Sequence, residues 1–222
     1  MRRFSFESFH GTFGLVYLLL VTNVLLAASA APLVALALTT DPARSWPLLA
    51  VAAAAAAPGG AAAFRAFGEH SAGGAAPVRA FARGYRDSWR HALAVGAIVA
   101  GTLTVLLVDV RALAASPAGV LVVPLLAVLS VLALGLGAVA LVVVAEAPRA
   151  RLRDVLRASA YLAVRRWYLT SASLVACGVQ AALFAQAPAL GLGLTAAPVL
   201  YVVWANSRYT LRPVLAAADA TP

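Results

Sequence analysis

The sequence predicts an all-α, polytopic membrane protein with about six transmembrane helices and two amphipathic cytoplasmic helices, in a single membrane domain over residues 1–222. Three observations lead to this prediction. Of the 222 residues, 63% are hydrophobic and only 11% are charged, which is far from the composition of a soluble domain. Apolar runs long enough to cross a bilayer recur along the chain. The arginines are concentrated in alternate connections between those runs.

The six predicted spans differ in strength. The first, third and fourth are strongly apolar, and the fourth is long enough to tilt. The fifth and sixth form a helical hairpin around a short turn that contains Pro188. The second is the weakest, because it is mostly Ala and is interrupted by Pro58, Gly59 and Gly60. In order, the spans cover residues 13–33, 46–63, 91–108, 119–145, 168–185 and 189–205.

Arginine placement predicts the orientation, because basic residues in short loops are retained in the cytoplasm. The 17 basic residues are all Arg. All but Arg44 and Arg111 precede the first span, follow the last, or lie between spans two and three or spans four and five. We therefore expect a multi-pass protein of the bacterial cytoplasmic membrane, with both termini and both arginine-rich loops in the cytoplasm.

Two alternatives fit part of the same pattern. A five-span arrangement that omits the second span and exports the N-terminus separates the arginines nearly as well. It is disfavoured because it exports Arg2 and Arg3 and leaves the apolar run 47–63 in the cytosol. The basic start, the apolar run and the small residues 28–30 also resemble a cleaved signal peptide, but a run of this length suits a retained span better.

Two basic segments, residues 77–90 and 149–166, are predicted to be helices that lie in the headgroup layer. In the first, Phe81, Tyr85 and Trp89 recur every four residues and share a face, while the arginines follow the same period on another stripe. The second segment repeats this separation of apolar and basic stripes. The candidate lipid or partner contacts on the two polar faces are Arg79, Arg83, Arg86, Arg90, Arg149, Arg153 and Arg157.

The net charge of +9 does not indicate a nucleic-acid partner, because the basic residues lie between apolar runs. The simplest interpretation is that the two basic helices set the orientation and bind anionic lipid headgroups. The alternative is a docking surface for a protein partner, such as a transporter subunit.

The sequence offers little for catalysis. The single cysteine, Cys177, lies in an apolar run, Glu146 is expected at the end of the fourth span, and Glu69 is expected in a loop. No histidine pair has the short helical spacing that a metal site needs, since the three are His10, His70 and His91. We therefore expect no cofactor and no enzymatic activity.

Three amide side chains lie within or at the end of the predicted spans: Asn23, Gln180 and Asn206. A buried amide in lipid needs a hydrogen-bond partner, so structural pairing between helices is the default interpretation. The alternative function is a small-solute permease or channel, which would require these amides to converge on one polar cavity.

The chain resembles the YesL-like family of bacterial integral membrane proteins of unknown function. The resemblance rests on an Asn-bearing first span closed by Pro32, on two basic segments that end at Trp89 and Trp167, and on the stretch 206–209. This chain departs from the family in its alanine-rich second span. The resemblance implies an accessory role near a carbohydrate transport system. Nothing indicates sugar binding, because Trp46, Trp89, Trp167 and Trp204 fall at span ends, where membrane anchoring explains them better.

Overall fold

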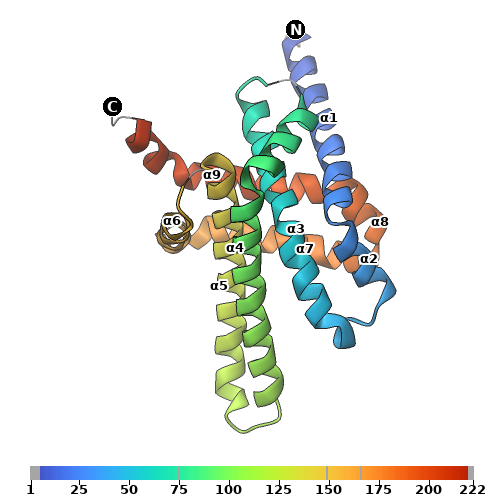
Figure 1. Ribbon diagram of the computed structural model, residues 1–222, viewed down its shortest axis with the longest axis vertical. Coiled ribbons are helices and arrows are strands. Elements are labelled where there is room, and N and C mark those ends of the chain that lie inside the picture. The colour runs from blue at the N-terminus through green and yellow to red at the C-terminus, as the bar shows by residue number, and fades with distance from the viewer. Residues whose placement is uncertain (1–5, 75, 149, 166, 220–222) are drawn as a thin grey trace, which may run out of the picture.

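The computed structural model describes residues 6–74, 76–148, 150–165 and 167–219 (Figure 1). Within these residues the regular structure is helical and no strand is present. The elements are α1 (Phe6–Ser29), α2 (Ala31–Thr39), α3 (Pro42–Ser71), α4 (Pro77–Leu113), α5 (Gly119–Glu146), α6 (Leu152–Arg165), α7 (Trp167–Gln186), α8 (Pro188–Leu190), the π-helix η1 (Gly191–Thr195) and α9 (Ala196–Asp219). The predicted all-α membrane fold is confirmed.

The candidate membrane spans match the predicted ones. Five helical stretches are long and apolar enough to cross a bilayer: α3, α4, α5, α7 and Pro188–Tyr209. The bent pair α1–α2 is a sixth candidate. Each of the six predicted spans falls within one of these stretches. In Figure 1, α3, α4 and α5 run roughly along the long axis of the molecule, whereas α7 and α9 run across it.

The first predicted span is a broken helix. α1 ends at Ser29 and α2 begins at Ala31, with a bend of 68° between them. Pro32 lies in the first turn of α2, where its missing N–H costs nothing and where its ring prevents α1 from continuing. The bend also lies against α3, since a Cβ added to Gly59 would be 2.9 Å from the Ser29 Cβ.

The second predicted span, the weakest in the sequence, is part of the most buried helix of the fold. α3 continues through Pro58, Gly59 and Gly60 and extends to Ser71, eight residues beyond the predicted end at residue 63. Ala61, Ala62 and Ala63 are completely buried. Small side chains suit this position because they let other helices approach the backbone from several sides.

Close approach between α3 and α4 depends on two glycines of α4. A Cβ on Gly84 would be 2.7 Å from the Arg65 Cβ, and one on Gly96 would be 2.6 Å from the Ala57 Cβ. The carbonyl of Ala54 has no N–H four residues ahead, because residue 58 is proline. That carbonyl faces Gly96, whose added Cβ would be 2.8 Å from its oxygen. The hydrogen bond that α3 loses at Pro58 therefore lies where α3 contacts α4.

The predicted boundary between the first basic helix (77–90) and the third span (91–108) is wrong. α4 is one helix of 37 residues, which corresponds to about 55 Å. No proline or adjacent pair of glycines occurs near residue 90, so the change from basic to apolar side chains does not interrupt the backbone. Phe81 is only 6% exposed and packs in the protein core, whereas Tyr85 and Trp89 are exposed.

The second basic segment forms a separate amphipathic helix, as the sequence predicts. Val155 and Ser159 of α6 are buried, and Val155 packs in a cluster with α3, α4 and α5. Arg153 and Arg157 are exposed on the other side of the helix. Figure 1 views α6 end-on, so this helix lies across the direction of α5. Arg149, also predicted as a contact, lies outside the described residues.

Candidate functional site

Most of the ion pairs in the described residues gather where α3 ends, α4 begins, α5 ends and α9 passes; we call this region the charged end. Glu69 binds two arginines there. The Arg65 Nε lies 3.3 Å from Glu69 Oε1, and an Arg83 Nη atom donates to Oε2 at 2.8 Å. Glu69 is a residue of α3 and not of a loop, which corrects the sequence prediction. It therefore joins α3 to α4.

Glu146, at the end of α5 as predicted, joins α5 to α9. The Trp204 indole N–H donates to Glu146 Oε1 at 3.3 Å, and the Arg208 Nε lies 3.9 Å from the same oxygen. The Arg208 guanidinium also stacks over the Trp204 ring and donates to the Ser71 hydroxyl of α3. Arg65 donates to the Ala145 carbonyl at 3.1 Å. These contacts hold four helices together at the charged end.

Trp204 corrects a second prediction. The sequence places it at a span end as a membrane anchor, but its side chain is only 4% exposed. It packs against Phe67 and Tyr201, with ring centroids 6.1 and 5.4 Å away. The geometry is that of a core residue whose N–H has a partly exposed partner, Glu146, and this arrangement favours tryptophan over other aromatic residues.

The predicted contact arginines lie on the outside of this network. Arg79, Arg86 and Arg90 of α4 and Arg153 and Arg157 of α6 are exposed. The Arg90 guanidinium lies 5.4 Å from the centroid of the neighbouring Trp89 ring. Arg83 differs from them because it takes part in the pair with Glu69. Glu69 and Glu146 are thus both paired, and exposed arginines outnumber the exposed acidic residues, Asp87 and Asp154, along the basic part of α4 and along α6.

Two of the three predicted amides meet at η1, the π-helical segment. A π-helix shifts its hydrogen bonds by one residue, so its carbonyls do not all find the usual partner. Asn23 of α1 is 1% exposed; its Nδ2 donates to the Gly193 carbonyl at 3.2 Å and its Oδ1 accepts from the Ala197 N–H at 2.6 Å. Gln180 of α7 donates to the Gly191 carbonyl at 2.6 Å and accepts from the Thr195 hydroxyl at 2.7 Å. Both amides therefore have a structural role.

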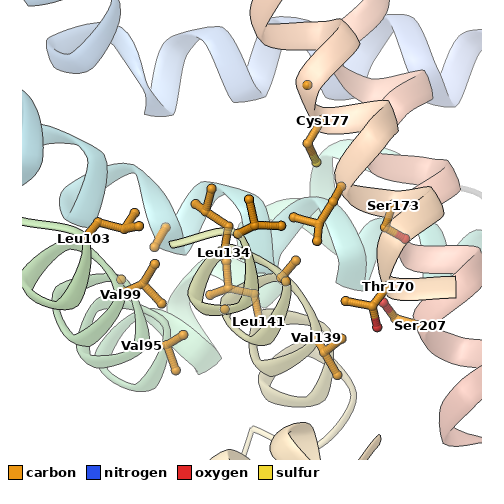
Figure 2. A pocket seen from close by; sticks show the side chains of 18 of the residues that line it. Val95, Val99, Leu103, Leu134, Val139, Leu141, Thr170, Ser173, Cys177 and Ser207 are labelled. Atoms are coloured by element: carbon orange, nitrogen blue, oxygen red, sulfur yellow. The ribbon is translucent and has the colours of Figure 1, made fainter. Parts of the chain in front are cut away.

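Asn206 lies elsewhere, at a partly open cavity of about 850 Å³ lined mainly by α4, α5 and α7 (Figure 2). Its amide donates to the Ser173 hydroxyl at 3.2 Å, which connects α9 to α7. Aliphatic side chains form most of the cavity wall, with Val95, Val99 and Leu103 of α4 on one side and Thr170, Ser173 and Cys177 of α7 on the other. The three amides do not converge on one polar cavity, so the geometry does not favour the permease alternative.

The described residues contain no group of three or more His, Cys, Asp or Glu side chains that could hold a metal ion. The comparisons with protein families, curated proteins and solved structures found no match to this chain. The charged end is therefore characterised by its own geometry alone. Its central residues were missed in the sequence, although the spacing of Arg65 and Glu69, four residues apart, could have indicated an ion pair on one helix face.

Proposed function

We propose that this membrane protein is a non-catalytic accessory or regulatory component of a transport system, and that it binds its partner through the exposed arginines of α4 and α6. The observation that carries the proposal is the division of charge at the charged end. Glu69 and Glu146 are paired within the bundle, so the arginines outside it present a cationic surface on helices that are held in place.

A rigid cationic surface favours a docking role because electrostatic complementarity selects partners and speeds their association. α6 supports this role, since its apolar face packs against three helices and the helix itself need not reorganise on binding. An acidic cytoplasmic face of a transporter subunit is the partner we propose, and anionic headgroups would assist by holding the complex at the membrane. The resemblance to the YesL-like family is what selects carbohydrate uptake among transport systems.

Co-purification after mild detergent extraction tests this proposal. We expect the wild-type chain to recover a transporter subunit, and the combined variant Arg79→Gln, Arg86→Gln, Arg153→Gln and Arg157→Gln to lose it. The matched control is Arg44→Gln with Arg111→Gln, which removes charge near the start of α3 and the end of α4, away from the charged end. A wild-type chain that always elutes alone, together with unchanged sugar uptake in a deletion strain, would refute the proposal.

A further inference from the structure

The cavity between α5 and α7 originates in the way these helices cross. Gly135 of α5 lets α7 approach, since a Cβ there would be 2.7 Å from the Thr170 methyl group and 3.2 Å from a Leu174 methyl group. One turn later the contact has ended: a Cβ on Gly178 would have no atom within 4 Å, although Gly178 lines the cavity. Because α7 runs across α5 (Figure 1), the two helices touch at one place and diverge beyond it.

The cavity wall has the chemistry of a hydrocarbon site. Leu134 and Leu141 of α5 and Val95 and Val99 of α4 supply branched apolar surface, and the remaining wall consists largely of alanine, leucine and glycine. Ser173 and Asn206 are bonded to each other, so neither requires a polar ligand. The volume of about 850 Å³ lies within the range of ordinary ligand sites. An empty apolar space of this size would forfeit many packing contacts.

The arginines of α6 indicate which class of molecule binds in the cavity. Thr170 lines the cavity and lies in the first turn of α7, which begins at Trp167 directly after the basic helix α6. Arg153 and Arg157 of α6 are exposed, and so is Arg165 at its end. Val155 of α6 packs in one cluster with Val95, which lines the cavity, so these arginines lie on a helix next to the cavity. Guanidinium binds phosphate with charge-assisted hydrogen bonds.

We infer that the cavity binds one acyl chain of an anionic phospholipid, whose phosphate lies against the arginines of α6. The bound lipid is a structural ligand that fills the space between α4, α5 and α7. This inference shares Arg153 and Arg157 with the proposed partner surface, but the cavity is formed within one chain, so Gly178→Phe tests lipid binding separately from partner binding.

The decisive variant is Gly178→Phe, which places a ring in the cavity at a position where a Cβ meets nothing. Gly101→Phe is the matched control: it is also an exposed helical glycine whose Cβ would have no neighbour within 4 Å, but it does not line the cavity. Both purified variants are exchanged into detergent with added phosphatidylglycerol, and retained lipid is measured by native mass spectrometry.

We expect the wild-type chain and Gly101→Phe to retain one phosphatidylglycerol. Gly178→Phe should reduce retention at least about tenfold, since its ring removes the burial of several methylene groups. Replacing phosphatidylglycerol with phosphatidylcholine should reduce retention by about tenfold or less, and so should Arg153→Gln with Arg157→Gln. The reason is that the cavity for the acyl chain remains in both cases. Equal retention by Gly178→Phe and wild type, or a bound mass equal to a second copy of the chain, would overturn the inference.

The unmodified chain provides a second test, because its single cysteine lines the cavity (Figure 2). Phosphatidylglycerol should slow the reaction of Cys177 with a membrane-soluble maleimide in a saturable way, whether or not Gly178→Phe folds. A rate that is independent of phosphatidylglycerol concentration would contradict the inference.

Discussion

Both the α3–α4 contact and the α5–α7 contact contain glycines, but the glycines have different effects on how closely the helices pack. At Gly84 and Gly96 of α4, the missing Cβ allows α3 to come so close that any side chain would collide with it. At Gly178 of α7, the missing Cβ leaves open space. The difference comes from how the helices run: α3 and α4 stay side by side, whereas α7 crosses α5 and separates from it (Figure 1). Helices that stay side by side can therefore place glycines at close contacts several turns apart, whereas crossing helices do so only near the crossing point, as at Gly135.

The largest effect is expected for Gly96→Leu. Its Cβ would lie 2.6 Å from the Ala57 Cβ and 2.8 Å from the Ala54 carbonyl oxygen, so α3 and α4 must separate. We expect a loss of about 3 kcal/mol in the free energy of unfolding, measured by thermal unfolding in detergent. Gly101→Leu, in the same helix at a position with no neighbour within 4 Å, is the control and should not be destabilised, because leucine has the higher helix propensity and meets no atom. Equal destabilisation of both variants would show that α3 and α4 are not in close contact.

A smaller loss is expected for Asn23→Leu. This change leaves the Ala197 N–H of α9 and the Gly193 carbonyl of η1 without their partner. The expected cost is about 1–2 kcal/mol. Gln180→Leu should cost less, because the Thr195 hydroxyl lies 3.2 Å from the Gly191 carbonyl and can take over as its donor. If Gln180→Leu proved the more damaging of the two in the same unfolding assay, the assignment of these roles would be wrong.

The ion pairs of the charged end should contribute less to the free energy of unfolding than the close contacts between helices. Glu69→Gln keeps the shape of the side chain but weakens its pairing with Arg65 and Arg83. Because these groups are partly exposed, we expect a loss of about 1 kcal/mol at low salt, with most of the difference from wild type removed at high salt. If the stability lost in Glu69→Gln did not depend on salt, the loss would reflect packing of the side chain rather than its charge.

The smallest effect, and the only stabilising one, is expected for Gly178→Ala. The added methyl group meets no atom, so only the higher helix propensity of alanine remains. The gain should be about 0.5–1 kcal/mol. The same Gly→Ala change at position 84 should destabilise the protein, because its Cβ would be 2.7 Å from the Arg65 Cβ. Opposite signs at the two positions would confirm the contrast between the two helix contacts in its simplest form.

The sequence predicts well those features that are local. Six apolar runs correspond to the candidate spans, and α6 separates basic from apolar residues at helical period. The start of α2 at Ala31, with Pro32 in its first turn, follows from the restricted backbone of proline. Features that depend on contacts between distant residues were missed. Pro58 does not end α3, and the polar start of α4 is continuous with its span.

The candidate site follows the same rule. The exposed arginines of α4 and α6 were identified because amphipathic periodicity is visible in sequence. The burial of Trp204 and its bond to Glu146 depend on α9 passing α5, which no local pattern encodes. The cavity is equally unpredictable, since it arises from the crossing of α5 and α7 and not from any segment alone.

We propose that α3, α4 and α5 span a bilayer with the charged end in the cytoplasm, and single-cysteine labelling in intact cells tests this central claim most directly. In a Cys177→Ala background, a cysteine is placed at Arg86 in α4, at Arg153 in α6, or at Ala115 in the turn between α4 and α5. A membrane-impermeant maleimide should label Ala115→Cys in intact cells, and Arg86→Cys and Arg153→Cys only after permeabilisation. Labelling of Arg86→Cys or Arg153→Cys from outside intact cells would contradict the claim.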